Sequence, residues 1–198
     1  MKNIYSNIFK FNQNTLKKAI NYLKRNEILA LPTETVYGLG GNAYSKKSIQ
    51  KIYKIKKRPK INPLIIHYHS YKEALKDIEI NEVFLRIYRR LSPGPITFIL
   101  KKKKNSKISP LANANLDTVA VRFPKNPVIR LILKKIDFPL AIPSANHSSG
   151  ISPVDALDVA EEFHNKIKMI INGGRSKIGI ESTVVDLTNN VKILRSGA

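Results

Sequence analysis

The order of strand, turn and helix is most evident in the stretch LPTETVYGLGGNAYSKKSIQKIYKIKKRPKINPLIIH, residues 31–67. It begins at the end of an apolar strand that we expect over 27–31 and runs into a Thr- and Gly-rich turn. A basic helix follows, and a second strand is expected over 63–68. This layout is typical of phosphate-handling sites, although the stretch contains neither of the familiar glycine-rich nucleotide-binding motifs.

The basic helix carries a lysine on its apolar side. Ser45 is placed to cap the helix, and its apolar stripe consists of Ile49, Ile52 and Tyr53. The same period continues to Lys56, so this ammonium group either extends to solvent or lines a cleft.

Arg58 lies just before Pro59, which biases its backbone toward an extended conformation. Lys56 and Arg58 then present two cations at a helix-to-strand corner. A phosphate is bound by such groups, arginine acting as a planar fork and lysine as a point charge.

The rest of the chain alternates between helical and strand periodicity. Helices are expected over about 13–25, 84–91, 127–135 and 156–163, and strands over 96–100, 118–123 and 140–146 and near 167–171, 182–187 and 191–195. This alternation predicts the α/β class. The sheet should be mixed parallel and antiparallel, because the late strands lack crossover helices.

Composition limits the number of domains, the kinds of site and the classes of protein that are possible. The 198 residues are 42% hydrophobic, which favours one domain over 1–198. Cysteine is absent, so disulfides and thiolate sites are excluded. Neither a signal peptide nor an apolar run of membrane length is evident, and we expect a cytoplasmic protein without membrane contact. The net charge of +21 favours polyanions, but lysine is abundant along the whole chain, so the charge indicates non-specific attraction only.

Two further polar features stand near strand ends. Alternation along 118–123 puts Thr118, Ala120 and Arg122 on one face, so a central strand would leave room for an anion beside the arginine, whereas an edge strand would expose it. Ser144 and Asn146 lie where the strand over 140–146 breaks into a turn, and turn chemistry alone also explains them.

Several long motifs follow one another along the chain: PTETVYGLG (32–40), KKRPKINPLIIH (56–67), SPGPITFIL (92–100), TVAVRFP (118–124), SAN…SP (144–153), ESTVVD (181–186) and ILRSGA (193–198). Together, and in this order, they resemble the threonylcarbamoyl-adenylate synthase family, the YrdC/Sua5 group. The resemblance covers nearly everything from residue 27 onward. It implies a twisted α/β sheet flanked by helices, with a large, positively lined cavity.

The resemblance also implies an activity. L-threonine, bicarbonate and ATP would give threonylcarbamoyl-adenylate and pyrophosphate, and Mg²⁺ is expected to accompany ATP. Partner proteins would then transfer the threonylcarbamoyl group to adenosine 37 of tRNA. No protein nucleophile is needed, which agrees with a sequence that offers no evident Ser-His or Cys-His arrangement. Catalysis would depend on positioning and on cations that stabilise charge at phosphorus.

The matching positions imply three sets of site residues. The family's catalytic set corresponds to Lys56, Arg58, Ser144 and Asn146. Its L-threonine-binding positions correspond to Thr35, His67, Arg122, Ser144 and Ser182. Its ATP-binding positions correspond to Arg58, Asn62, Thr118, Asn146, Ser152 and Arg195. His67 and His69 share a strand face, but with no third ligand evident we expect no protein-bound metal there.

Some alternatives stay open. The chain could be an enzyme of the same fold that uses a carbamoyl acceptor other than threonine, or a double-stranded RNA-binding protein that uses the basic surface. An intact set of Lys56, Arg58, Arg122 and Arg195 is unnecessary for shape-based RNA binding and favours the enzyme. The chain stops just after the last motif, so it is either the short, single-domain form or a piece of a longer form.

Overall fold

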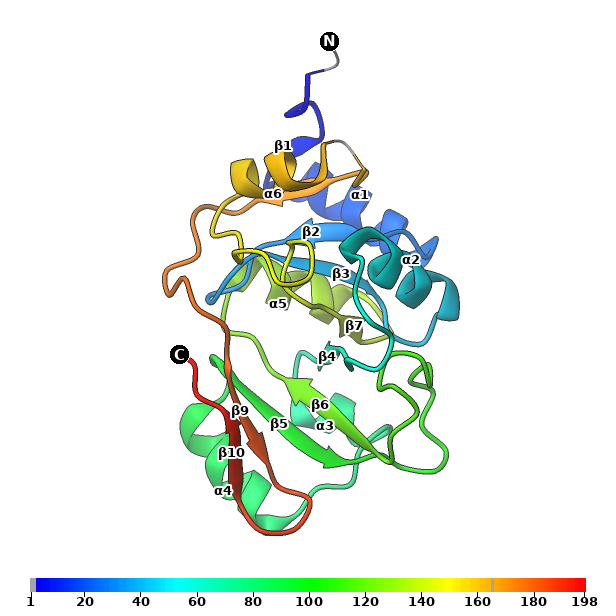
Figure 1. The fold of residues 1–198 in the computed structure, drawn as a ribbon, viewed down its shortest axis with the longest axis vertical. Helices are drawn as coiled ribbons and strands as arrows, with labels where there is room; N and C mark the ends of the chain where they lie inside the picture. The colour runs from blue at the N-terminus through cyan, green and yellow to red at the C-terminus, as the bar shows by residue number, and fades with distance from the viewer. Residues whose placement is uncertain (1–2, 165) are drawn as a thin grey trace.

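A mixed sheet of ten strands organises residues 3–164 and 166–198, which are the residues that the computed structural model describes. The strands lie in the order β1-β8-β2-β3-β7-β4-β6-β5-β9-β10 (Figure 1). Their bounds are β1 Ile8–Lys10, β2 Leu29–Leu31, β3 Gly38–Asn42, β4 Ile65–His67, β5 Ile96–Lys101, β6 Thr118–Arg122, β7 Leu140–Ala141, β8 Ile170–Asn172, β9 Thr183–Asp186 and β10 Lys192–Arg195. The helices are α1 Gln13–Lys24, α2 Lys46–Lys56, α3 Tyr71–Ala74, α4 Glu82–Leu91, α5 Pro127–Lys135 and α6 Ala156–Phe163.

Parallel and antiparallel neighbours are interspersed, which confirms the predicted fold class. β1, β8 and β2 run parallel to one another, as do β4 with β6 and β5 with β9. The pairs β2–β3, β3–β7, β4–β7, β5–β6 and β9–β10 are antiparallel.

Helices cover both faces of the half of the sheet that contains β1, β8, β2 and β3. Leu29 and Leu31 of β2 pack with α1 and α5, whereas Ala30 between them packs with α6 on the opposite face. This is the alternation expected of a strand with two buried faces. The other half of the sheet has its own core, formed by α2, α4 and the strands from β4 to β9.

Local signals account for most element boundaries. The side chain of Ser45 accepts a hydrogen bond from the amide of Ser48, 3.3 Å away, and begins α2. Asn126 caps α5 in the same way, and Pro127 at its first position needs no hydrogen-bond partner for its nitrogen. The predicted range 127–135 is therefore the observed helix.

One prediction in the stretch 31–67 is wrong. The sequence predicts a turn after residue 31, whereas residues Gly38–Asn42 form strand β3 between β2 and β7. A Gly-rich strand has no side-chain alternation by which it could be predicted. The close packing around β3 requires that its glycines have no side chain. A β-carbon at Gly38 would lie 2.3 Å from Cγ2 of Ile142, and one at Gly40 would lie 2.6 Å from Cδ1 of Leu31.

Other differences are smaller. The strand expected over 140–146 consists of Leu140–Ala141 alone, with Ser144 making an isolated bridge to Gly38. Strand β1 and the four-residue helix α3 were not predicted, since each is too short to show a periodic pattern. No helix in the described ranges is both long and apolar enough to cross a membrane.

Candidate functional site

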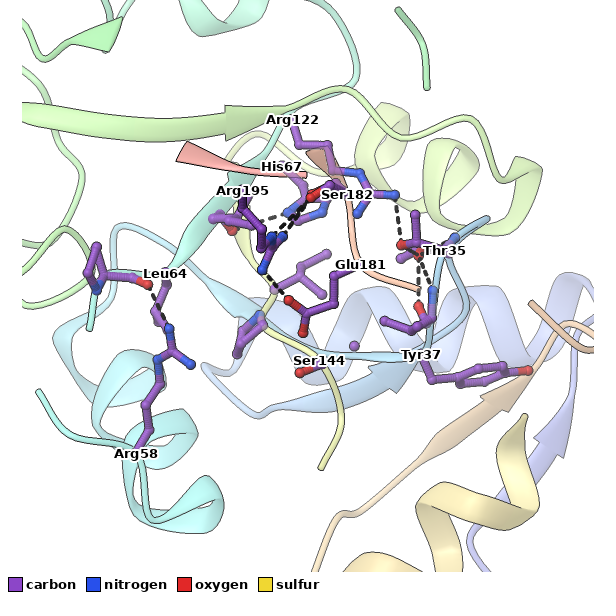
Figure 2. A pocket seen from close by; sticks show the side chains of 17 residues that line it. Thr35, Tyr37, Arg58, Leu64, His67, Arg122, Ser144, Glu181, Ser182 and Arg195 are labelled. Atoms are coloured by element: carbon purple, nitrogen blue, oxygen red, sulfur yellow. Dashed lines mark hydrogen bonds and ion pairs between the residues drawn. The ribbon is translucent and has the colours of Figure 1, made fainter. Parts of the chain in front are cut away.

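A small cavity of about 90 Å³ lies between the two halves of the sheet. Its wall is formed by the β2–β3 connection, β4, the end of β6, the turn after β7 and the segments that begin β9 and end β10 (Figure 2). The polar residues of this wall include Thr35, Arg58, His67, Arg122, Ser144, Glu181, Ser182 and Arg195.

Arg122 lies in the wall of this cavity, at the end of β6. Its strand, β6, lies between β4 and β5, and the residue is only 5% exposed. Nη2 donates to Oε1 of Glu34 at 2.8 Å and to Oγ1 of Thr35 at 2.9 Å. Nε is buried without a hydrogen-bond partner among the described residues. A buried guanidinium donor without a partner is costly, and Arg122 lines the cavity, so an anionic ligand there would offset that cost.

Glu34 holds that arginine in place. Its Oε2 accepts from the amides of Lys125 at 3.0 Å and Asn126 at 3.1 Å, at the start of α5. Burial alone would raise the pKa of Glu34, but the charge and hydrogen bond of Arg122, together with backbone hydrogen bonds such as that from Asn126, outweigh it and leave the pKa below its ordinary value. The sequence reasoning missed Glu34, although it lies inside the motif PTETVYGLG.

Hydroxyl groups surround the arginine. Oγ1 of Thr35 lies 2.9 Å from Oγ1 of Thr33, and Oγ of Ser182 lies 2.8 Å from Oγ1 of Thr97. These four side chains are buried. The structure thus brings together Thr35, Arg122 and Ser182, three of the residues implied for threonine.

His67 contributes an uncharged ring. Burial of the ring is the larger cause, and the positive charge of Arg122 the smaller one, that lower the pKa of the imidazole to about 3. Nδ1 lies 3.1 Å from the carbonyl oxygen of Ile65. A carbonyl only accepts, so Nδ1 carries the proton, and Nε2 is left as the acceptor.

Lys56 does not extend to solvent. It is 1% exposed, and its Nζ donates to the carbonyl oxygens of Ser144 at 2.6 Å and Asn146 at 2.5 Å. Burial, and then the charge of Arg58, lower the pKa of this ammonium to about 8. Lys56 therefore ties α2 to the turn that carries Ser144 and Asn146.

Arg58 is aimed by the end of α2. Lys57 adopts the left-handed conformation, with φ of 50°, and so turns the chain out of the helix. Nε and Nη2 of Arg58 each lie 3.1 Å from a carbonyl oxygen, those of Asn62 and Pro63 respectively. Burial lowers the pKa of this guanidinium.

A second cavity of about 510 Å³ adjoins the first, within the range of roughly 300–1,000 Å³ that is usual for small-molecule sites. It is polar, and the residues implied for ATP that line it are Arg58, Asn62, Asn146 and Ser152, together with Lys56. Arg58, Ser144 and Glu181 line both cavities and form their boundary.

Asn146 shapes the loop beside the larger cavity. Its Nδ2 donates to the carbonyl oxygens of His147 at 2.8 Å and Gly150 at 2.7 Å. The amide thus closes the SANHSSG turn, while the Asn146 backbone carbonyl accepts from Lys56.

Thr118 and Glu181 differ in where they lie relative to the two cavities. Thr118 lies at the start of β6, on the same face as Arg122 but about 13 Å away along the strand, and lines neither of the two cavities. Glu181, which the sequence reasoning missed, forms an ion pair with Arg195 at the cavity boundary. It begins the motif ESTVVD.

Comparisons with known proteins agree on one family. A family model for Sua5, YciO and YrdC proteins, described as "Telomere recombination", matches residues 21–197. The threonylcarbamoyl-AMP synthase of Pyrococcus abyssi is 42% identical over 175 residues, which are 87% of this chain and 51% of that protein. The enzyme of the same name from Bacillus subtilis is 38% identical over 185 residues, 92% of this chain and 53% of that protein.

A solved structure has the same fold. The crystal structure of P. abyssi Sua5 complexed with L-threonine matches with a TM-score of 0.90 at 38% identity, covering 96% of this chain and 57% of that one. The chain thus spans about half the length of these relatives.

Proposed function

Because the chain belongs to the Sua5/YciO/YrdC family, we propose that it is a threonylcarbamoyl-AMP synthase unit that condenses L-threonine, bicarbonate and ATP. One observation carries the proposal: a small cavity lined by Arg122, whose Nε is buried without a partner among the described residues, lies beside a larger cavity lined by cations. An amino acid in the first cavity and a nucleotide in the second would meet at Arg58, Ser144 and Glu181.

Threonine suits the smaller cavity. Its carboxylate would accept from Nε of Arg122, which lacks a partner among the described residues. Its hydroxyl would donate to the neutral ring of His67 and exchange hydrogen bonds with Thr35 and Ser182. The same P. abyssi relative was crystallised with L-threonine, which supports this ligand.

ATP suits the larger cavity. Lys56 and Arg58 would contact the phosphates, and Asn62, Asn146 and Ser152 would line the nucleotide's path. Arg195 would reach the phosphates from the boundary. Thr118, on the far end of the same face of β6, would act only toward the distal part of the nucleotide.

The reaction then needs only positioning and cations. Bicarbonate loses hydroxide to give carbon dioxide, the threonine amine attacks its carbon, and the amine releases a proton. An oxygen of the resulting carbamate attacks the α-phosphorus of ATP. The bond from that phosphorus to the bridging oxygen breaks, and pyrophosphate leaves with the electron pair. Lys56 and Arg58 would stabilise the charge that develops at phosphorus.

Mg²⁺ fits this site only as an ion carried largely by the phosphates. No group of three or more His, Cys, Asp or Glu able to hold a metal occurs in the described part of the chain. Mg²⁺ commonly binds through one or two carboxylates together with phosphates and water, and Glu181 is the carboxylate at hand. The ion would neutralise phosphate charge.

The remaining assignments extend the same proposal. Residues 1–198 would form one catalytic unit that works in the cytoplasm and passes its product to proteins that modify adenosine 37 of tRNA. A double-stranded RNA-binding role alone would not require a buried arginine beside a closed set of hydroxyl groups. Another acceptor than threonine is tested directly by the choice of amino acid.

The test is pyrophosphate release together with mass spectrometry of the nucleotide product. We expect release to require L-threonine and bicarbonate together, and the product to have the mass of threonylcarbamoyl-adenylate. Glycine and serine serve as controls. Equal release with glycine, or release without bicarbonate, would contradict the proposal.

A further inference from the structure

Glu181 places a carboxylate where the proposed reaction would bring anions together. It is the acidic residue that the two adjoining cavities share, and in the described lining of both cavities it has no acidic neighbour. Figure 2 shows its side chain in the middle of the pocket, between Arg195 and Ser144. A negative charge at this point repels phosphates, so its presence in a phosphate-binding site calls for an explanation.

The hydrogen bonds of Arg195 suggest that role. Nε donates to the carbonyl oxygen of Ser182 at 3.1 Å, and Nη2 donates to that oxygen at 2.9 Å and to the Ser182 hydroxyl at 3.2 Å. These contacts orient the guanidinium. Nη1 is left to bind an anion, and the anion bound to it is the carboxylate of Glu181.

Glu181 also acts on the other cations. Burial lowers the pKa values of Lys56 and Arg58, and the negative charge of Glu181 opposes that shift at both groups. The carboxylate therefore lies within electrostatic reach of Lys56, Arg58 and Arg195.

The backbone of Glu181 is anchored, whereas its side chain is partly exposed and is held by Arg195 and by a hydrogen bond of 3.4 Å from the Ser152 hydroxyl. Its carbonyl oxygen accepts from the amide of Ala198 at 3.0 Å. The side chains of Glu181 and Arg195 are each 38% exposed. Exchange of one anion for another on Arg195 therefore requires no unfolding of either element.

We propose that Glu181 is an exchangeable counter-ion, which occupies Arg195 in the empty site, is displaced by the nucleotide's phosphates and returns when pyrophosphate leaves. This inference rests on the proposed function. A competing carboxylate weakens polyphosphate binding and so favours release of the product. Because the pair is partly exposed and screened by water, we expect its effect on affinity to be about threefold to tenfold.

The experiment measures binding of inorganic pyrophosphate by calorimetry, without divalent cations so that metal binding cannot contribute. We expect Glu181→Gln to bind pyrophosphate about threefold to tenfold more tightly than the unmodified protein. Glu181→Asp, which keeps the charge, should stay near the unmodified value. Glu79→Gln, at an exposed position in a different part of the chain, makes the same change in net charge and should leave the affinity unchanged.

The sign of the effect separates this role from structural damage, since a disturbed site binds more weakly. In an Arg195→Ala background, the gain from Glu181→Gln should largely disappear, because the competition is for that guanidinium. Thermal unfolding confirms that each variant is folded.

Two outcomes overturn the inference. If Glu181→Gln binds pyrophosphate equally or more weakly, while the unmodified protein retains threonine-dependent pyrophosphate release, the counter-ion role alone fails. If the unmodified protein neither binds pyrophosphate nor releases it from ATP, the proposed function and this inference fail together.

Discussion

Arg122 and Glu34 form a buried ion pair whose geometry leaves one donor for a ligand. Their side chains are 6% and 12% exposed, and two backbone amides hold the carboxylate from the other side. Fixing an arginine in this way reduces the rearrangement needed when an anion binds. Glu34 therefore acts on the proposed threonine site through Arg122 and is a positioning residue.

We expect Glu34→Gln to raise the KM for L-threonine about tenfold or more and to change kcat less, because the variant loses orientation of a binding group. The free energy of unfolding should fall by about 1–3 kcal/mol, since a buried charge loses its partner. Steady-state kinetics and urea unfolding measure the two effects. Glu79→Gln is the matched control, and an unchanged KM for threonine would refute the positioning role.

Because of Lys56, we expect enzymatic activity to fall at alkaline pH. Its pKa in the folded protein is about 8, below the ordinary value of 10.5, so the cation proposed to contact phosphate would be lost as pH rises through 8. We expect kcat/KM for ATP to fall above about pH 8. Lys56→Gln keeps donors for the carbonyls of Ser144 and Asn146, and should be weakly active without this fall. A persistent fall in that variant would assign the titration to another group.

The same shift has the opposite effect on stability. Between about pH 8 and 10.5 the folded protein holds Lys56 neutral, whereas the unfolded chain binds a proton there. The unfolded state thus binds more protons, and the contribution of this group to stability rises with pH across that window. Loss of activity above pH 8 is therefore not explained by unfolding at Lys56.

At the scale of elements, the glycine strand β3 positions the turn that carries Ser144. Gly38 bridges to Ser144, and a β-carbon added to Gly38 would meet the side chain of Ile142 and the carbonyl oxygen of Pro143. A side chain on Gly38 would displace the segment 142–144, whereas one on Gly40 would meet the flexible end of Leu31. The two positions point to the same face of β3 and both lie near Ile142, but only a β-carbon at Gly38 would also press on backbone, at the carbonyl oxygen of Pro143.

We expect Gly38→Ala to lower the free energy of unfolding by about 1–3 kcal/mol through overpacking. It should also lower kcat/KM about 10²-fold, because a shift near 1 Å at Ser144 disturbs the boundary between the cavities. Gly40→Ala should cost stability while the activity per folded molecule stays near that of the unmodified protein. Denaturant titrations and active-site-normalised kinetics distinguish them. Equal activity of the two variants would contradict this account of β3.

The net charge of +21 gives the whole molecule a field that attracts polyanions non-specifically. Any RNA bound by this field is held through phosphates, and each contact releases counterions. The proposed substrates instead bind in cavities whose charged groups are partly shielded from bulk ions. Salt therefore separates the two interactions.

We expect RNA affinity to fall by orders of magnitude when salt rises from about 50 to 200 mM, as for several phosphate contacts. Threonine-dependent pyrophosphate release should change only severalfold over that range. A mobility-shift titration beside a pyrophosphate assay at each salt concentration makes the comparison. Tight, salt-resistant and sequence-selective RNA binding without nucleotide turnover would reverse the assignment.

Features that depend on near neighbours could be predicted from the sequence. The period of Ile49, Ile52 and Tyr53 placed Lys56 on the apolar side of α2 but left open whether its ammonium group extends to solvent, and the alternation along β6 placed Arg122 and Val121 on opposite faces of the strand. The caps and the proline of α5 defined a helix whose observed bounds match the prediction. These signals are local because helix and strand periods repeat within a few residues.

The long-range contacts could be seen only in the tertiary structure. Glu34 meets Arg122 across 88 positions in sequence, and Lys56 meets Ser144 across the same separation. Glycine has no side chain, so β3 left no periodic trace and became a strand through its pairing with β2 and β7. The partners of the carboxylates and the joining of the two cavities at Glu181 depend on how distant segments pack, which no local pattern encodes.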